Sequence, residues 1–556
     1  MQKPWLSQYA GVAEHIDLNR FNSIPAIFDS AFARFSDRPM AINMGKSLTY
    51  REFDQYSRDV AAWLQTLGLQ KGDRIAIMMP NCLQYLILVP AILRAGYAVT
   101  NINPLYTPDE LTHQLNDSGS KAIFILENFA HALEVSLPNL PNIKHVVVSS
   151  LGDMLGFKGK IVNFALRNVK KMVPAWRIDA AIPFKRVLAE GAQKTYQPVQ
   201  LSHDDLAFLQ YTGGTTGVSK GAALTHGNIV ANVLQAEQWC APAIGDLNNG
   251  ATFVAALPLY HIFGLTVNAL YALHIGGCVL LITNPRDIPA FIKDLQKHPF
   301  HVLPAVNTLF VALNHNPEFK KLDFSSLRVA LGGGMAVQKA VADQFHEITG
   351  VPICEAYGLS ETSPAALMNP IQLTAFTGYT GLPISSTDVA ILDDDGKEVP
   401  YGSPGEIAIR GPQVMAGYWQ RPDETAKVMT ADGFFRSGDI GIMNEQGFVK
   451  IIDRKKDMVL VSGFNVYPNE VEDVAVMHPK VLECAVIGVA DDYSGEAVKM
   501  FVVKKDASLT EQELQAFLKE HLTGYKRPKY IEFRTELPKS NVGKILRKDL
   551  REKPTN

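Results

Sequence analysis

The chain has 556 residues, too many for one ordinary domain, so we expect two or three units built around large hydrophobic cores. Hydrophobic residues make up 47% and charged residues 20%, which indicates a globular protein and excludes a disordered or fibrous one. The formal net charge of −3 does not favour nucleic acid as a partner. Five cysteines lie far apart without a C-x-x-C pair, which argues against a zinc site or a disulfide framework and indicates a reducing compartment.

The first 370 residues alternate short apolar runs with helix-length segments. Because these runs are apolar on both faces, they indicate parallel strands covered by helices, and we predict an α/β fold. The stretch MQKPWLSQYAGVAEH has no uninterrupted apolar core, so we expect no signal peptide. Residues 85–99 are the most apolar, but Pro90 and Arg94 interrupt them, which favours a buried strand or helix over a membrane span. The predicted strands are DRIAIMM, KAIFIL, KHVVVSS, ATFVAAL, CVLLIT, HVLPAV and LRVALGG.

One segment, residues 154–178, contains six basic residues and no acidic one. A helical wheel predicts an amphipathic helix that can lie on an anionic membrane surface. The alternative is an ordinary helix that packs its apolar face on the core and leaves its basic face in solvent. The predicted basic face carries Lys160, Arg167 and Lys171, and the apolar face carries Ile161, Val162, Ala165, Val169, Met172 and Val173.

The stretch YTGGTTGVSKGAALTH, residues 211–226, has the composition of a phosphate-binding loop. Its glycines let backbone N–H groups approach an anion, its threonines add hydroxyl donors, and Lys220 adds a positive charge. It does not match the P-loop pattern, because Lys220 stands between Ser219 and Gly221. We predict that the strand DDLAFLQYT enters the loop and that the helix NIVANVLQAEQW leaves it.

Two further loops carry residues suited to a nucleotide. In EAYGLSET (355–362), Tyr357 is able to stack on a base and Glu361 to ligate Mg²⁺ on phosphate oxygens. In RSGDIG (436–441), Asp439 suits ribose hydroxyls, and Arg454 follows shortly afterwards. Taken singly, each has a commonplace alternative, a solvated Glu or a turn-capping Asp.

The sequence pattern changes after residue 376. Short alternating runs punctuated by Gly and Pro predict a mostly antiparallel sheet or small β-barrel over residues 376–452. We place a hinge in the charged cluster 453–457, so that residues 1–452 form a large N-terminal domain and residues 458–556 a small mobile α+β domain. The tail LPKSNVGKILRKDLR (537–551) contains Lys539, Lys544 and Lys548, and in isolation it indicates only a solvated basic helix.

The Gly/Thr loop (211–226), EAYGLSET (355–362), RSGDIG (436–441) and the tail (537–551) follow one another in this order. As a set, these four motifs resemble the adenylate-forming superfamily of acyl-CoA synthetases, adenylation domains and luciferases. The resemblance runs from about SLTYREFDQYSRDVAAWL to GKILRKDL and so covers most of the chain. Within the superfamily, ITNPRDIP, GPQVMAGYWQRPDET and VSGFNVYPNEVEDV are most similar to bacterial long-chain fatty-acid–CoA ligases. The resemblance implies that a carboxylate attacks the α-phosphorus of ATP to form acyl-AMP, and that CoA then displaces AMP.

The resemblance also implies a role for each motif residue. Lys544, Glu361 and Lys220 are the implied catalytic residues, and Glu361 is the implied Mg²⁺ ligand. Rotation about a hinge at Asp453 and Lys456 would exchange Lys544 for the loop 461–468. The implied pyrophosphate-binding residues are Thr212, Gly213, Gly214, Thr215, Thr216, Gly217 and Lys220, and the implied ribose-binding residues are Asp439 and Arg454. The implied adenine-binding residues are Gly332, Gly333, Gly334 and Tyr357, with Gly358 and Ser360 beside them. The implied acyl-chain residues are His261, Phe263, Leu265, Val306 and Gly334, and the implied pantetheine residues are Ser462, Gly463 and Phe464.

Several positions depart from the family pattern. Gly213 stands where Ser is usual, Ser219 where Pro is usual, and Ser360 where Thr is usual. Arg436 and Ser437 occupy the positions of a common His-Thr pair. We expect these departures to change kinetics and not the type of reaction.

Other interpretations share part of this pattern. A medium-chain or aryl acid–CoA ligase, or an acyl-AMP ligase that loads a carrier protein, would use the same ATP motifs. A catalytically silent nucleotide-binding or scaffold protein is disfavoured, because Lys544, Glu361 and Asp439 are all present. The apolar walls HIFGLTVNALYAL and VLPAVNTLFVAL favour an alkyl chain. We therefore expect fatty acid, ATP, Mg²⁺ and CoA as ligands, a monomer or homodimer, and a cytoplasmic protein partly bound to the inner face of the membrane.

Overall fold

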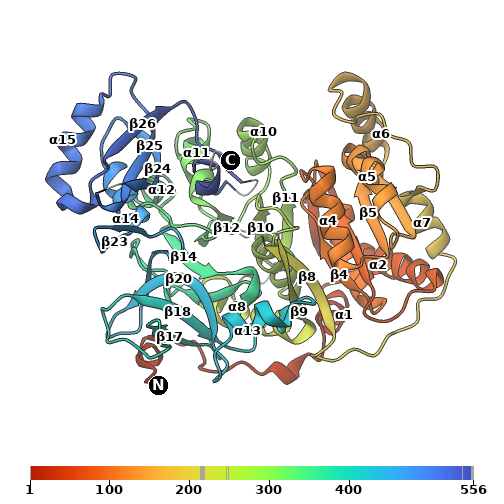
Figure 1. Cartoon of the computed structure of the whole chain (residues 1–556). Coiled ribbons are helices and arrows are strands. Elements are labelled where there is room, and N and C mark those ends of the chain that lie inside the picture. Colours follow the sequence, from red (N-terminus) through yellow and green to blue (C-terminus); the bar gives the residue numbers. More distant parts are fainter. Residues whose placement is uncertain are drawn as a thin grey trace.

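The computed structural model describes residues 2–212, 219–245, 247, 250–491, 493–540 and 543–551. Two large sheets and a smaller antiparallel sheet form the bulk of the molecule, and a separate sheet near the C-terminus lies at one side (Figure 1). The predicted α/β class, with a small α+β unit at the end of the chain, is confirmed. No helix among these described residues is long and apolar enough to cross a membrane.

The first large sheet has eight strands, of which β8-β4-β3-β5-β6-β7 run parallel. Its other edge is antiparallel, because β9 returns beside β8 and β19 pairs with β9. In sheet order the strands are β19 (Gly417–Tyr418), β9 (Lys220–Thr225), β8 (Leu206–Thr212), β4 (Ala98–Asn101), β3 (Arg74–Met78), β5 (Ala122–Leu126), β6 (His145–Ser149) and β7 (Ile182–Pro183).

The second large sheet has nine strands with a parallel centre, as the apolar runs predicted. Its two ends are antiparallel, where β15 pairs with β14 and β2 pairs with β1. The order is β16 (Leu382–Pro383), β15 (Ala365–Met368), β14 (Ile353–Gly358), β13 (Val329–Gly332), β12 (Val302–Ala305), β10 (Thr252–Ala255), β11 (Cys278–Leu281), β1 (Pro39–Asn43) and β2 (Lys46–Thr49).

Helices fill the space between the two large sheets and cover their outer faces. The apolar stretch 85–99 contains α3, all of whose residues are buried, and α3 packs against β3 of one sheet and β1 of the other. A helix that is apolar on all sides suits this central layer, since none of its faces is exposed to solvent. The central layer contains α1 (Ile24–Arg34), α2 (Tyr50–Leu64), α3 (Leu83–Arg94) and α8 (His226–Ile244); the outer helices are α4 (Pro108–Ser118), α5 (Ala130–Ser136), α10 (Ile288–Leu295), α11 (Asn307–Asn314) and α12 (Lys339–Thr349).

Residues 376–452 form mainly antiparallel strands, as their alternating pattern predicted. A four-stranded sheet has the order β17 (Asp388–Leu392), β18 (Gly405–Arg410), β20 (Phe435–Met443) and β21 (Val449–Arg454). The short helix α13 (Pro422–Val428) lies between β19 and β20 in the chain. Strand β21 ends at the predicted hinge, and the domain boundary there stays a prediction.

The C-terminal sheet has five strands with its own hydrophobic core. The long hairpin β24–β25 is its centre, β22 and β23 form a second hairpin, and β26 runs parallel to β25. The elements are β22 (Val459–Val461), β23 (Phe464–Val466), α14 (Pro468–Ala475), β24 (Val481–Asp491), β25 (Gly495–Lys504), α15 (Glu511–His521) and β26 (Tyr530–Arg534).

Two local predictions need correction. The predicted helix NIVANVLQAEQW lies within α8, but the chain that leaves the Gly/Thr loop first forms the strand β9, because KGAALT pairs antiparallel with β8. The predicted helix of residues 154–178 is shorter: α6 (Phe157–Phe164) continues as the π-helix η7 (Ala165–Val169) and then ends. Lys171 has φ of +50°, which is incompatible with a right-handed helix.

Candidate active site

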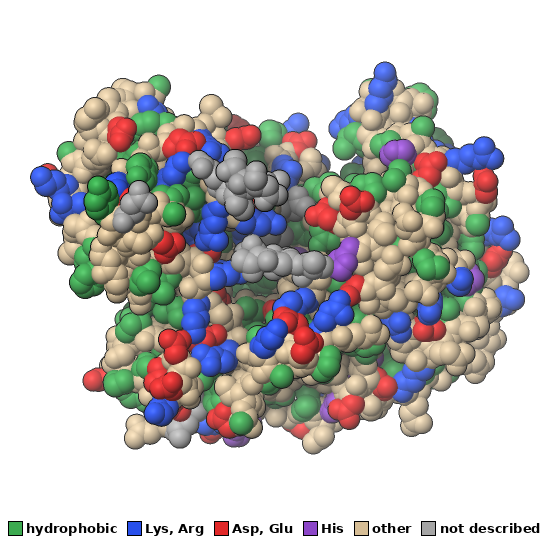
Figure 2. Space-filling model, in the orientation of Figure 1, with side chains coloured by type: hydrophobic (Ala, Val, Ile, Leu, Met, Phe, Trp, Pro, Cys, Tyr) green, Lys and Arg blue, Asp and Glu red, His purple; other side chains and the backbone are tan. Residues whose placement is uncertain are grey.

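A cavity of about 2460 Å³ lies where the two large sheets, the antiparallel sheet and the C-terminal segment meet. Its opening appears as a central hollow bordered by Lys and Arg side chains (Figure 2). The carboxyl ends of β8, β13 and β14 reach this cavity, and the residues after β21 close another side. Most of the predicted site residues that the structure describes therefore line one space.

The Gly/Thr loop begins at Thr212, and Gly213, Gly214, Thr215, Thr216 and Gly217 lie outside the described residues. Lys220 lines the cavity at the start of β9. Its ammonium forms an ion pair with Glu424 of α13 and lies 5.1 Å from the ring centre of Tyr418. The ion pair lowers the pKa of Glu424 to about 2, so this carboxylate is charged and holds the side chain of Lys220.

Glu361 is held by a partner that the sequence did not reveal. The Tyr418 hydroxyl donates to Glu361 Oε1 at 2.8 Å, and Met415 N–H donates to the Glu361 backbone carbonyl at 2.8 Å. Burial raises the pKa of Glu361, while the Tyr418 hydrogen bond opposes that shift. Glu361 lines the cavity in this orientation and would be the residue to hold a Mg²⁺ ion, which would offset phosphate charge there.

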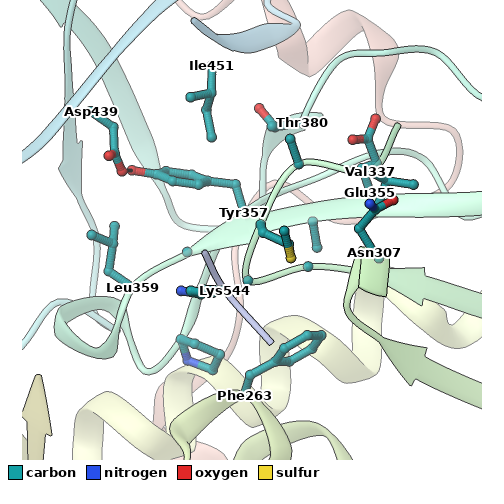
Figure 3. A pocket seen from close by; sticks show the side chains of 18 of the residues that line it. Phe263, Asn307, Val337, Glu355, Tyr357, Leu359, Thr380, Asp439, Ile451 and Lys544 are labelled. Atoms are coloured by element: carbon teal, nitrogen blue, oxygen red, sulfur yellow. Dashed lines mark hydrogen bonds between the residues drawn. The ribbon is translucent and has the colours of Figure 1, made fainter. Parts of the chain in front are cut away.

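Tyr357 and Asp439 form the centre of the predicted nucleotide site (Figure 3). The Tyr357 hydroxyl donates to Asp439 Oδ2 at 2.7 Å, and both residues are buried. Arg454 Nε lies 3.5 Å from Asp439 Oδ1, because residues 439 and 454 pair across β20 and β21. The sheet register thus explains why these two side chains, fifteen positions apart, lie together.

The glycines at the end of β13 allow close packing around the cavity. A Cβ at Gly333 would lie 3.0 Å from the Phe263 ring, and Gly334 has φ of +79°, which favours glycine. Gly332, Gly358 and Ser360 also line the cavity.

Glu355 is a site residue that the sequence reasoning missed. It is buried at the cavity wall near Asn307 and Val337, and burial raises its pKa to about 8 (Figure 3). Its Oε2 has no hydrogen-bond partner among the residues that the structure describes. Glu355 is therefore a buried carboxyl group at the cavity wall that carries a proton near neutral pH.

Lys544 reaches the cavity from the C-terminal segment. A Cβ built on Gly334 would lie 3.8 Å from Lys544 Cε, and Figure 3 shows Lys544 between Tyr357 and Phe263. Two hydrogen bonds join Lys544 to Ser540: Ser540 N–H donates to the Lys544 carbonyl at 2.7 Å, and Lys544 N–H donates to Ser540 Oγ at 3.1 Å. Burial and nearby Arg454 lower the pKa of Lys544 to about 8. Burial and Lys544 lower the pKa of His261 to about 3, so His261 is neutral.

The predicted acyl residues separate into two groups. His261, Phe263 and Gly334 line the cavity. Leu265 is fully buried in the main core, and Val306 packs beside Gly334, so neither is among the lining residues. The apolar lining of the cavity also includes Val267 and Tyr271 of the π-helix η8 (Gly264–Tyr271), which lie in the predicted wall HIFGLTVNALYAL. Trp239, Ile244 and Met368 line it as well, and the sequence reasoning missed these three.

The predicted CoA residues lie away from the cavity. Ser462, Gly463 and Phe464 are exposed at the β22–β23 hairpin, and Phe464 stacks on Tyr525 with ring centres 4.8 Å apart. The predicted hinge residues Asp453 and Lys456 do line the cavity. The structure therefore brings together the described residues assigned to ATP and three of the five assigned to the acyl group, and does not bring the pantetheine residues to them.

Two family models match the chain. The AMP-binding enzyme model matches residues 28–419, and the model of the AMP-binding enzyme C-terminal domain matches residues 470–544. The chain belongs to the AMP-binding enzyme family. The resemblance to adenylate-forming enzymes is thereby confirmed.

Similar proteins cover nearly the full length of this AMP-binding enzyme. A long-chain-fatty-acid–CoA ligase of Yersinia pestis is 54% identical over 99% of this chain and 98% of its own. A ligase of the same name from Bacillus subtilis is 38% identical over 100% of this chain and 98% of its own. The crystal structure of ATP-bound MatB from Rhodopseudomonas palustris shares 28% identity, with a TM-score of 0.79 over 96% of this chain and 98% of that one. The anthranilate CoA ligase AuaEII, at 23% identity and a TM-score of 0.85 over 96% and 98% of the two chains, shares the fold.

Proposed function

We propose that this protein is an ATP-dependent, AMP-forming long-chain fatty-acid–CoA ligase. The observation that carries the proposal is the position of Lys544, which meets Gly334 between a polar and an apolar part of one cavity. Asp439 and Glu361 lie in the polar part, while Trp239 lies in the apolar part. A carboxylate at the head of an alkyl chain would meet the α-phosphate of ATP between these two parts. The curated relatives that carry this name support the same substrate class.

In the first step the fatty carboxylate attacks the α-phosphorus, and the bond to the β-phosphate oxygen breaks so that pyrophosphate leaves. Both reactants are anions, so the site must offset charge. Protonated Lys544 would contact the carboxylate and the α-phosphate oxygens, and Lys220 would contact the leaving phosphates. Tyr357 and the backbone of residues 332–334 would enclose adenine, while Asp439 would bind ribose hydroxyls.

Mg²⁺ fits this site as a partner of Glu361. Because Tyr418 occupies Oε1 through a hydrogen bond, the carboxylate has a fixed orientation and one oxygen left to bind. A single carboxylate together with substrate phosphates is a usual donor set for Mg²⁺, which neutralises phosphate charge when bound.

The second step requires a change in the C-terminal part. CoA thiolate attacks the acyl carbonyl carbon and AMP leaves, so the thiol must reach the place that Lys544 occupies. Rotation about residues 453–457 would withdraw Lys544 and bring Gly463 and its neighbours to the cavity. Gly463 has φ of +85°, and no atom lies within 4 Å of the position that a Cβ would take there, which leaves room for a pantetheine arm.

We also propose that the protein is cytoplasmic and contacts the inner face of the membrane reversibly. Long-chain fatty acids partition into lipid, and residues 154–178 carry exposed basic and apolar side chains. A contact of this kind would place the enzyme where its substrate accumulates.

The test is AMP release with ATP and Mg²⁺, using saturated acids from butyrate to stearate and also benzoate, each with and without CoA. Turnover that requires CoA and peaks on long acids supports the proposal. A peak on medium-chain or aryl acids would keep the reaction and overturn the substrate. Acyl-AMP that accumulates regardless of CoA would favour transfer to a carrier protein.

A further inference from the structure

The segment that contains α6 exposes large hydrophobic side chains beyond what a helix packed on a core would expose. Phe157 is 78%, Ile161 60% and Phe164 62% exposed. These positions are spaced i, i+4 and i+7, so they form one ridge along the outer face of α6. The apolar residues of this segment are thus divided, because the ridge faces outward while Val162 packs on the core.

The opposite face of α6 fixes the segment to the body of the protein. A Cβ at Gly159 would lie 1.8 Å from the Gly152 carbonyl oxygen, so only glycine permits this approach. Gly152 N–H donates to Asn163 Oδ1 at 2.8 Å, and Val162 and Leu166 pack against the main core. The ridge is therefore held outward by firm packing on its back.

The charges also differ from the helical wheel. Arg167, predicted on the membrane-facing basic side, has a half-exposed side chain that pairs with the body of the protein: its Nη2 donates to the buried carboxylate of Glu127 at 2.6 Å and to Ser150 Oγ at 2.9 Å. Four lysines of the segment are exposed, and none of them forms an ion pair among the residues that the structure describes. Lys158 donates to the Met44 carbonyl, so three surface lysines remain for a ligand: Lys160, Lys170 and Lys171. Beside the last two, Val169 and Met172 are 71% and 52% exposed.

We infer that the outer face of α6 and η7 inserts into an anionic lipid surface and that the three surface lysines bind the lipid head groups. An apolar ridge flanked by lysines without ion pairs has the chemistry of an interfacial helix. Arg167 is a structural anchor and not a lipid ligand. This inference names the surface for the membrane contact proposed above and rests on that proposal. The inserting residues are Phe157, Ile161, Phe164, Val169 and Met172, and the head-group ligands are Lys160, Lys170 and Lys171.

The place of this ridge suits an enzyme whose C-terminal part moves. In Figure 1, α6 projects at the end of the molecule opposite the C-terminal sheet with α15. Figure 2 shows basic and hydrophobic side chains together on this projection. Docking there leaves the proposed hinge at 453–457 free to rotate.

The experiment is co-sedimentation of the full-length protein with phosphatidylcholine vesicles, with and without phosphatidylglycerol. Three proteins are compared: the wild type, a ridge variant with Phe157→Ser, Ile161→Ser and Phe164→Ser, and a control with Tyr401→Ser and Tyr530→Ser, which removes two exposed aromatics elsewhere. We expect the ridge variant to lose binding to anionic vesicles by at least about tenfold and the control to bind like the wild type. Turnover on a short, water-soluble acid should be equal in all three proteins, so loss of ligase function is separable from loss of docking.

A second measurement locates the ridge directly. Four of the five native cysteines are buried, so Phe164→Cys provides an exposed site for a polarity-sensitive fluorophore. A blue shift with anionic vesicles, reduced by Lys160→Glu, Lys170→Glu and Lys171→Glu and by salt, is the expected result. Equal binding of the ridge variant and the wild type would overturn the inference while leaving membrane contact standing. If the wild-type protein binds no vesicles, both the inference and the proposed membrane contact are overturned. The same conclusion follows if the wild type forms a dimer that the ridge substitutions abolish.

Discussion

Arg547 Nη2 donates to both carboxylate oxygens of Glu472 at 2.8 Å, and Arg547 Nη1 lies 3.5 Å from Asp453 and from Asp457. Arg551 Nη2 donates to Asp457 Oδ1 at 2.9 Å. One arginine thus ties the C-terminal segment, which presents Lys544, to α14 and to the predicted hinge. The surrounding carboxylates raise the pKa of Arg547, so it stays charged.

Replacement of Arg547 by Met should destabilise the protein by about 3 kcal/mol, because it leaves several poorly solvated carboxylates without their shared partner. We also expect acyl-AMP formation to fall more than thioester formation from supplied acyl-AMP. Urea unfolding and the two half-reactions measure these effects. Lys548→Met changes a neighbouring exposed cation and serves as the control. Unchanged stability in Arg547→Met would show that this cluster does not fix the arrangement.

Removal of the Lys544 side chain should impair acyl-AMP formation but not thioester formation. In Lys544→Ala, pyrophosphate release should fall by about 10²-fold or more, since a charge that stabilises the transition state is lost. Thioester formation from supplied acyl-AMP should persist, because the proposed rotation withdraws Lys544 from the site in that step. Lys539→Ala, which removes a surface lysine paired with Glu483, should affect neither. Equal loss of both half-reactions would refute the exchange of Lys544 for the loop 461–468.

Acyl-AMP formation should also depend on pH through Lys544. Its pKa is lowered to about 8, so the ammonium is charged below this pH and neutral above it. The adenylation rate should therefore fall as pH rises through about 8. Lys544→Arg keeps the charge to much higher pH, and its residual activity should show no such fall. A wild-type profile that is flat to pH 10 would contradict this assignment.

Glu424 would compete with phosphate for Lys220, because the two side chains form an ion pair in the structure. Because the pair is partly exposed, Glu424→Gln should tighten pyrophosphate binding by no more than about fivefold. The change is measurable as a lower inhibition constant for pyrophosphate. Asp423→Asn alters the adjacent exposed carboxylate and should have no effect. Weaker pyrophosphate binding in Glu424→Gln would mean that Glu424 orients Lys220 for the phosphates.

Gly334→Ala tests the approach of Lys544 to β13. An added methyl group would lie 3.6 Å from Val306 Cγ1 and 3.8 Å from Lys544 Cε, at a backbone φ of +79°. Gly350→Ala is matched to it, with φ of +73° and open space around the Cβ. Both variants should lose about 1 kcal/mol of stability from backbone strain. Only Gly334→Ala should lose adenylation activity, and equal activity losses would disprove a local role for Gly334.

The strands were predicted well because each depends on a pattern that spans only a few residues. Buried runs such as KAIFIL became parallel strands, and the spacing of Gly and Pro after residue 376 predicted antiparallel ones. Asp439 and Arg454 were assigned one role by resemblance, and the register of β20 and β21 supplies the physical reason.

Contacts between distant segments could not be predicted in this way. Tyr418 meets Glu361, and Glu424 meets Lys220, only because β19 pairs with β9 across almost two hundred residues. The sequence did not indicate that Glu355 lines the cavity, because its burial there depends on three-dimensional packing. The helical wheel of residues 154–178 placed Arg167 in the wrong orientation, since it assumed a straight helix and could not include Glu127.

The pairing of β19 with β9 also limits how the chain can be divided. Gly417 and Tyr418 pair with Ala223 and Ala222, and Trp419 N–H donates to the Gly221 carbonyl at 2.8 Å. A fragment that stopped before residue 417 would leave β9, with its small and flat Gly and Ala side chains, as an open sheet edge. Such an edge is a template for pairing with other chains, so fragments cut there should aggregate even though their strands are intact.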